Sequence, residues 1–220
     1  MKRPEPLFIN RADAGQHLAL ELRDYAHRPQ VIVLGVPRGG VPVAFEVARS
    51  LEAPLSLCLV RKLGVPHQPE LAMGAIASGG VRYLDPEIIA RCRVSPELLE
   101  QVIQREQREL ERRERQYYQS RPLLPITDRI VIVVDDGMAT GATMRVALAA
   151  LRQHSLQKLV VAIPVAPASS LEALNGLADT VICLATPDPF HAVGEWYQDF
   201  SQVEDDTVCA LLRRSQPETN

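Results

Sequence analysis

A run of hydrophobic, then acidic, then small residues in the middle of the chain is the pattern best suited to chemistry. Residues 131–134 are all β-branched and predict a strand buried on both faces. Asp135 and Asp136 follow, and residues 137–143 supply small side chains and hydroxyls before a segment of helical periodicity. Amide N–H groups and the helix dipole at such a turn create an anion site. Two acids beside it require sugar hydroxyls or a bridging divalent metal, so a phosphorylated sugar is expected.

This run, VIVVDDGMATGAT, resembles the signature of the type I phosphoribosyltransferases. That signature is a hydrophobic strand, two acids, a few small or apolar residues and then Thr-Gly-x-Thr. The resemblance implies that Asp135 and Asp136 hold the ribose hydroxyls of phosphoribosyl pyrophosphate (PRPP). It also implies that the next loop wraps the 5′-phosphate of PRPP, through Gly137, Met138, Ala139, Thr140, Gly141, Ala142 and Thr143. The alternative is a Rossmann-type turn whose acids only cap the helix.

The loop after the expected strand at residues 31–35 is a second candidate, because ligands bind beyond the carboxyl ends of parallel strands. It contains Arg38, Gly39 and Gly40, whose guanidinium group and exposed amides suit a polyphosphate. The resemblance implies that this is the pyrophosphate loop, where members of the family often hold a non-proline cis peptide bond. The alternative is a plain turn.

Arg61 and Lys62 begin a third candidate loop, which two prolines and a glycine predict over residues 61–71. Adjacent cations repel each other unless an anion lies between them. These side chains therefore either contact the β-phosphate of PRPP or diverge in solvent. The family has a mobile loop in this region, so the resemblance implies a lid that excludes water from the reacting centre.

Aromatic side chains gather within residues 188–200. The family places a small hood beside the sheet, and the resemblance implies that Phe190, Trp196 or Tyr197 stacks on the acceptor, usually a nucleobase. The alternative is that Trp196 and Phe200 anchor the last helices to the core.

The reaction that the resemblance implies is transfer of the 5-phosphoribosyl group from PRPP to a nitrogen acceptor, with release of pyrophosphate and with Mg²⁺ as cofactor. Positive charge builds on the ribose, so positioning and electrostatics matter more than a covalent nucleophile. Ala139 stands where enzymes acting on 6-oxopurines usually carry an acid, which disfavours hypoxanthine and guanine relative to adenine, a pyrimidine or an acceptor that is not a base. The catalytic roles are implied for Asp135, Asp136, Arg61 and Lys62.

Two other functions share the signature. One is a catalytically silent module that senses PRPP or binds a protein partner. The other is a relative of the kinases that make PRPP, which would need a nucleotide site and a longer chain.

The elements that must position these residues alternate between strand and helix, which predicts an α/β fold with a doubly wound parallel sheet. We expect one domain over residues 1–220, with a helical insertion at about 85–120 and a C-terminal hood element at about 186–212. The expected strands are residues 31–35, 55–60, 131–134, 159–163 and 180–184, with a β-hairpin formed by residues 74–77 and 81–84. The expected helices include residues 41–51, 143–153 and 169–177, with two further helical patterns around Trp196 and Leu211.

A long, highly charged helix is expected from Ser95, which caps it, to Tyr118. It is either a solvated helix held by ion pairs between successive turns or an arm that packs on a partner subunit. The side chains available for such packing are Leu98, Leu99, Val102 and Ile103.

The composition is that of a globular protein, with 220 residues, 46% hydrophobic residues and a formal net charge of −3. We expect no nucleic-acid partner, no membrane span and no secretory signal. The four cysteines form no CxxC pair, and Cys58 and Cys183 are expected to be buried thiols, which predicts a cytoplasmic protein. The expected partners are PRPP, a small-molecule acceptor and, because oligomers are common in the family, a second copy in a homodimer.

Overall fold

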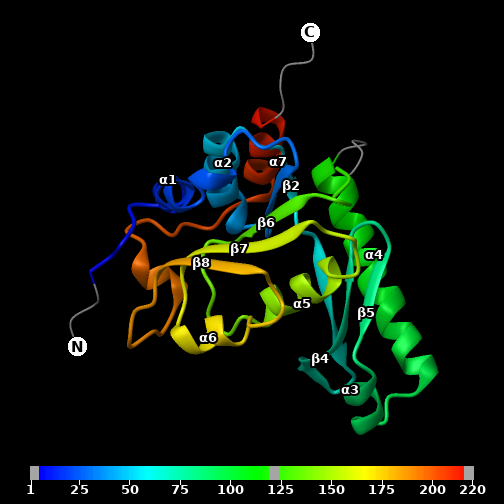
Figure 1. Cartoon of the computed structure of the whole chain (residues 1–220). Helices are drawn as coiled ribbons and strands as arrows, with labels where there is room; N and C mark the ends of the chain where they lie inside the picture. The colour runs from blue at the N-terminus through cyan, green and yellow to red at the C-terminus, as the bar shows by residue number, and fades with distance from the viewer. Residues whose placement is uncertain (1–4, 119–123, 216–220) are drawn as a thin grey trace. The chain divides into compact units, whose positions relative to one another are not determined.

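The computed structural model describes residues 5–118 and 124–215 of the chain (Figure 1). They form two units, each with its own sheet. The first unit takes its described residues from Met1–Leu57, Leu124–Gly141 and Leu156–Asn220, and the second from Cys58–Leu123 and Ala142–Ser155. Most of the insertion expected at about 85–120 falls in the second unit, while residues 119–120 lie outside the described part.

The first unit contains a five-stranded sheet in which every neighbouring pair of strands is parallel, which confirms the α/β class. The strand order is β2-β1-β6-β7-β8. Both β1 and β6 are buried along their whole length, as their runs of apolar residues predict. The strands are β1 Val31–Gly35, β2 Leu55–Leu57, β6 Ile130–Val134, β7 Lys158–Val165 and β8 Thr180–Ala185.

The strand order reverses between β1 and β6, and this reversal brings two candidate loops together. From β1 the chain continues to β2 on one side, and it returns later as β6 on the other side. Gly35 at the end of β1 pairs with Val134 at the end of β6, and the Val36 N–H donates to the Val134 carbonyl. The loops after these two strands therefore start side by side, at the edge where open parallel sheets bind ligands.

Three helices of the first unit, α1, α2 and α7, lie together on one face of this sheet (Figure 1). The helix expected over residues 169–177 is shorter in the structure, where it ends at Glu172, and Gly176 further along adopts a positive φ of 79° that a helix would not contain. The pattern around Trp196 forms only a short 3₁₀ turn. The elements are α1 Arg11–Glu21, η1 Arg23–Tyr25, α2 Gly40–Leu51, α6 Ala168–Glu172, η2 Val193–Trp196 and α7 Asp205–Arg214.

The second unit is a three-stranded antiparallel sheet with helices on its two faces. The predicted β4–β5 hairpin is confirmed, and Gly79 and Gly80 in its turn both adopt positive φ. Ala75 and Ala77 pack toward α5, whereas Arg61, which is paired with Ile76 on the other face, reaches α4. The elements are β3 Val60–Val65, β4 Gln68–Ala77, β5 Val81–Leu84, α3 Pro86–Arg91, α4 Pro96–Tyr118 and α5 Ala142–Leu151.

The expectation of an irregular loop over residues 61–71 is wrong, because β3 and β4 form a hairpin there. Only Pro66 and His67 separate the two strands, and His67 takes the positive φ that such a tight turn needs. Pro69 is tolerated inside β4 because the register shifts at Gly64, whose missing side chain leaves room for it. The strand expected at residues 55–60 ends at Leu57, because Val60 begins strand β3 of the other sheet.

Helix α4 matches the prediction, and Ser95 caps it by accepting from the Leu98 N–H at 3.3 Å. One face packs against β3 and β4 of the same unit, so the helix is not solvated all round. Beside this face lie ion pairs between successive turns, including those of Glu109 with Arg112 and Arg113. The buried residues of α4 are Val102, Ile103, Glu106, Leu110 and Tyr117.

Two smaller expectations concern burial. Cys58 is buried as expected, but Cys183 is only partly buried because β8 is an edge strand with a single neighbour. Among the helices of the described residues, none has the length and apolar character needed to cross a membrane.

Candidate functional site

The two acids of the signature lie directly after β6, in the first unit. The Asp136 N–H donates to Oδ1 of Asp135 at 2.9 Å, which fixes the Asp135 carboxylate relative to the Asp136 backbone. Burial raises the pKa of Asp135 well above its ordinary range, and the neighbouring Asp136 charge acts in the same direction. The buried acid is therefore held at an energetic cost, as is common at functional sites.

Asparagine at position 135 is expected to stabilise the protein at neutral pH. The pKa of Asp135 is raised above its ordinary 3.8, so the folded chain binds more protons than the unfolded chain above that pH, and stability falls as pH rises. Asn removes the charge but keeps the oxygen that accepts from Asp136. We expect the Tm of Asp135→Asn to exceed that of the wild type by about 2–4 °C at pH 7, with the difference closing below pH 3.8. Thermal unfolding at both pH values checks this, and a lower Tm of the variant at pH 7 would contradict it.

Arg11 is the residue of the site that the sequence analysis missed. Its Nε donates to Oδ2 of Asp136 at 2.7 Å, and the two side chains are only 11% and 14% exposed. Nη1 of Arg11 donates to the Ser201 carbonyl at 2.7 Å, and the guanidinium lies 3.9 Å from the centre of the Phe200 ring. A weak signal existed: Arg11 is the first residue of α1, where the helix dipole disfavours a cation that has no anionic partner.

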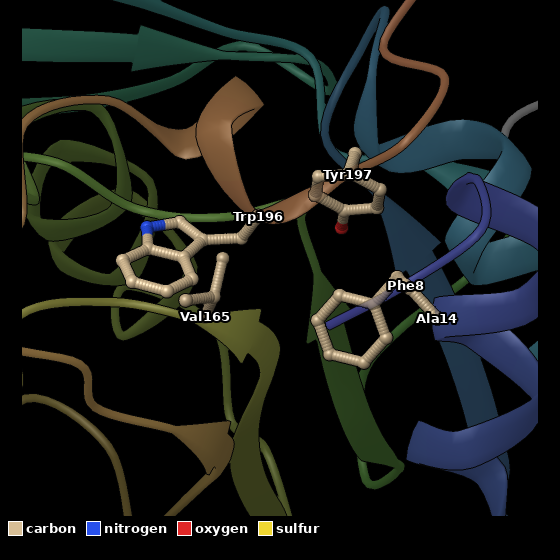
Figure 2. Close-up of a cluster of buried hydrophobic side chains, with 5 residues drawn as sticks. All are labelled: Phe8, Ala14, Val165, Trp196 and Tyr197. Atoms are coloured by element: carbon tan, nitrogen blue, oxygen red, sulfur yellow. The ribbon is translucent and has the colours of Figure 1, made fainter. Parts of the chain in front are cut away.

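Tyr197 holds the backbone of the same acid. Its hydroxyl donates to the Asp136 carbonyl at 2.5 Å. Burial raises the pKa of Tyr197, and the Asp136 charge raises it further, so the hydroxyl keeps its proton and acts as a donor. Figure 2 shows the Tyr197 ring beside Phe8 in a buried cluster that also contains Trp196 and Val165. Packing of segments from both ends of the described chain thus sets the position of Asp136.

The loop after β1 packs tightly against the acids. A Cβ atom on Gly39 would lie 2.0 Å from Oδ2 of Asp136, and one on Gly40 would lie 2.9 Å from Oδ1 of Asp135. Only glycine fits at either position. The peptide bond between Pro37 and Arg38 is cis, as the resemblance implies for this loop. Arg38 is exposed and lies 3.9 Å from Glu204, a distance at which an exposed ion pair contributes little.

The start of the expected phosphate loop is anchored by backbone contacts in the first unit. The Met138 N–H donates to the Val165 carbonyl at 3.0 Å, and the Ser170 hydroxyl donates to the Ala139 carbonyl. Gly137 touches the hood, because a Cβ there would lie 2.3 Å from Val193 Cγ1. Gly141 has a φ of 72°, which favours glycine. Thr140 is exposed at the tip, and Ala142 and Thr143 form the first turn of α5, in the second unit.

Arg61 and Lys62 lie on strand β3 of the second unit. Arg61 donates to Oε2 of Glu106 through Nε at 2.9 Å and Nη2 at 2.5 Å, and Arg105 donates to the other oxygen. Glu106 is 8% exposed, so Arg61 neutralises a buried carboxylate. Neighbouring residues of a strand point to opposite faces, so Lys62 does not share this environment.

The aromatic residues of the expected hood pack mainly on protein. Trp196 and Tyr197 are 7% and 4% exposed, and the Phe190 ring stacks on Trp196 with 6.2 Å between ring centres. Phe190 is less buried than either and lies at the outside of the cluster. The alternative of anchoring therefore describes the contacts of Trp196 and Tyr197, and Phe200 packs on Arg11 and Tyr197.

Among the His, Cys, Asp and Glu side chains of residues 5–118 and 124–215, no group of three could hold a metal ion. The donor set near the loops is a pair of acids, one of them bound by Arg11. Magnesium commonly keeps water and binds substrate phosphates with few protein ligands, which fits a cation that is bound together with a polyphosphate.

Comparisons with known proteins show the family of the chain. The profile of the phosphoribosyl transferase domain family matches residues 8–199. A protein of Mycobacterium tuberculosis (strain H37Rv), provisionally named a phosphoribosyl transferase, is 47% identical over 209 residues, which cover 95% of this chain and 47% of that protein. The chain thus spans about half the length of the curated relatives it matches.

Solved structures give the same result for the fold. The crystal structure of TT1426 from Thermus thermophilus is similar with a TM-score of 0.86 and 40% identity, covering 96% of this chain and 99% of that chain. A hypoxanthine-guanine phosphoribosyltransferase from Bacillus anthracis has a TM-score of 0.50 at 13% identity, covering 86% of this chain and 87% of its own, a likeness of fold alone.

Proposed function

The chain belongs to the phosphoribosyl transferase domain family, and from that premise we propose that it transfers the 5-phosphoribosyl group of PRPP to a nitrogen acceptor and releases pyrophosphate. One observation carries the proposal. Asp135 and Asp136 lie at the reversal of the strand order and pack against the backbone of Gly39 and Gly40. Twin acids beside a glycine loop suit a ligand with vicinal hydroxyls next to a polyphosphate.

The acids act by position and charge. Each accepts a ribose hydroxyl, and their negative charge stabilises the positive charge that builds on the ribose as the bond from C1 to the pyrophosphate oxygen breaks. Neither acid needs to attack C1, because the acceptor nitrogen does so. Backbone N–H groups within residues 137–143, apart from that of Met138, which donates to the Val165 carbonyl, bind the 5′-phosphate and hold the sugar in one orientation.

The leaving pyrophosphate is bound by the loop after β1. The amide of Gly39 and the exposed Arg38 side chain contact its oxygens, and a magnesium ion bound with the pyrophosphate would neutralise part of its charge. We also propose that Arg61 and Lys62 contact the β-phosphate. For Arg61 this requires phosphate oxygens to replace part of its contact with Glu106.

The acceptor is the least constrained part of the proposal. Among the aromatic residues of the hood, Phe190 is the one whose exposure suits stacking on a base, whereas Trp196 and Tyr197 support it from within the cluster. Ala139 has no proton acceptor, so we propose adenine, a pyrimidine or an acceptor other than a base. The four free thiols suit a reducing compartment, and we propose a homodimer that works in the cytoplasm.

Calorimetry followed by a turnover assay tests this function. PRPP titrated into the protein with excess MgCl₂ is expected to release or absorb heat with a stoichiometry of one per chain. Pyrophosphate release is then measured with a panel of adenine, guanine, hypoxanthine, uracil and orotate. Turnover with a base establishes the transferase, whereas binding without turnover on any acceptor would favour the PRPP-sensing alternative. Absence of heat with PRPP would remove the proposed function altogether.

A further inference from the structure

Asp136, Ser201 and Phe200 of the first unit contact the Arg11 guanidinium, and the proposed reaction gives Arg11 no role. We propose that Arg11 is a positioning residue that holds the Asp136 carboxylate in one orientation at the ribose site. This inference rests on the proposed function, because it assigns Arg11 a part in PRPP binding. It concerns a residue 125 positions away from its partner in the sequence, outside the signature.

The base of the Arg11 side chain is fixed by the start of α1. Asn10 caps this helix by accepting from the Asp13 N–H at 3.0 Å, and the Asp13 carboxylate accepts in turn from the Ile9 N–H at 3.0 Å. These reciprocal bonds define where the first helical residue lies. The backbone from which the Arg11 side chain extends is therefore held in a fixed position.

The head of the side chain is fixed as well. Its Nε and Nη1 donate in two directions, to Asp136 and to the Ser201 carbonyl, and its plane covers the Phe200 ring at 3.9 Å. Phe200 itself packs against Tyr197, with 5.0 Å between ring centres. A planar guanidinium can make both hydrogen bonds and the ring contact at once, whereas a lysine ammonium is a point charge without a fixed plane.

Two neighbouring groups consequently restrict the position of the Asp136 carboxylate, namely the Arg11 guanidinium and the Gly39 backbone. Arg11 donates to Oδ2, and the Gly39 backbone lies so near the same oxygen that a Cβ on Gly39 would overlap it. In Asp135, Oδ1 accepts from the Asp136 N–H. Within the described residues, these contacts engage one oxygen of each acid, and the second oxygens suit two adjacent hydroxyl groups of a ribose.

Arg11 also limits the cost of placing two acids together. The positive charge opposes the repulsion between Asp135 and Asp136 that raises the pKa of Asp135. Without Arg11, the pair would keep its repulsion and Asp136 would lose its orientation. PRPP binding would then have to supply the ordering that the free protein now supplies.

The test compares Arg11→Ala, Arg11→Lys and a control, Arg23→Ala, which removes an exposed arginine of the same unit. Calorimetry gives the Kd for PRPP with Mg²⁺, and steady-state assays give kcat and KM for PRPP and for the acceptor. We expect Arg11→Ala to weaken PRPP binding and to lower kcat/KM for PRPP by about 10- to 100-fold, with Arg11→Lys in between. The KM for the acceptor and the behaviour of Arg23→Ala should stay close to the wild type.

Stability is separated from positioning by a further variant and by temperature. Phe200→Leu removes the ring under Arg11 but keeps both hydrogen-bonding groups, and we expect a PRPP effect smaller than that of Arg11→Ala. All assays are run well below the Tm of each variant. A purely structural role would lower the Tm and leave the Kd for PRPP unchanged, and that result would overturn the inference. If the wild type itself binds no PRPP, the proposed function fails and this inference fails with it.

Discussion

Asp136→Asn is expected to lower PRPP-dependent pyrophosphate release by about 100-fold or more while the chain stays folded. Asn keeps an oxygen that can accept from Arg11 Nε, and the Tyr197 hydroxyl bonds the backbone carbonyl, which the substitution does not change. What disappears is the negative charge beside the ribose at the moment when positive charge develops there. The measurement is steady-state pyrophosphate release at saturating PRPP and acceptor, with circular dichroism to verify the fold.

Asp24→Asn is the matched control for this substitution. Asp24 is an exposed carboxylate of the same unit, in the 3₁₀ turn that follows α1. The Asp24→Asn substitution changes the net charge by the same amount as Asp136→Asn but does not alter the two acids after β6. Turnover of Asp136→Asn equal to that of the wild type would remove the role given to this carboxylate.

Gly39→Ala is the second substitution with a large expected effect. Gly39 has φ −62° and ψ −35°, a helical conformation in which alanine is normally favoured over glycine. The backbone conformation at position 39 therefore does not disfavour alanine. The new Cβ would lie 2.0 Å from Oδ2 and 2.7 Å from Cγ of Asp136, so the carboxylate or the loop must move. A displacement of about 1 Å at such a site costs about 100-fold in activity, and we expect a loss of PRPP affinity of that order.

Gly79→Ala separates this contact from the general effect of adding a methyl group. A Cβ on Gly79 would meet no atom within 4 Å, although its φ of +83° makes alanine strained. We expect Gly79→Ala to lower the Tm slightly and to leave the PRPP affinity unchanged. Calorimetric titration of both variants gives the comparison. Equal affinities in Gly39→Ala and the wild type would show that the loop after β1 does not confine the acids.

The central sheet and the position of the acids could be predicted because local signals there agree. A run of β-branched residues has little choice but a buried strand, and charged residues at its end must lie at the rim of the sheet. The rule for ligand sites in parallel sheets then selects the loops after β1 and β6, and Gly35 and Val134 do pair at that edge.

The β3–β4 hairpin could not be predicted because its signals conflict. Pro66 and Pro69 read as loop residues, yet a tight turn needs only two positions and a bulge accepts a proline. The decisive contact is between Pro69 and Gly64, where a Cβ would lie 2.6 Å from the Pro69 carbonyl oxygen. That complementarity depends on the register of two strands, which composition does not specify.

Side-chain contacts between segments that are far apart in the sequence could not be predicted from local sequence patterns. Arg11 and Asp136 belong to different elements, and no periodicity relates them. The aromatic residues posed a similar problem, because a ring that stacks on a ligand and a ring that packs on Phe8 are the same residue type. Tyr197 is the latter, with 5.4 Å between its ring centre and that of Phe8.

The parallel bridge between Phe8 and Tyr197 has a consequence for the order in which the site is assembled. Proteins are synthesised from the N-terminus, so both acids are translated after Arg11 but before Tyr197 and Ser201. The supports of Asp136 come from both sides of the signature in the sequence, namely Arg11 before it and Tyr197 and Ser201 after it. A nascent chain therefore carries the whole signature before Asp136 has all of these supports, because Ser201 is translated last among them.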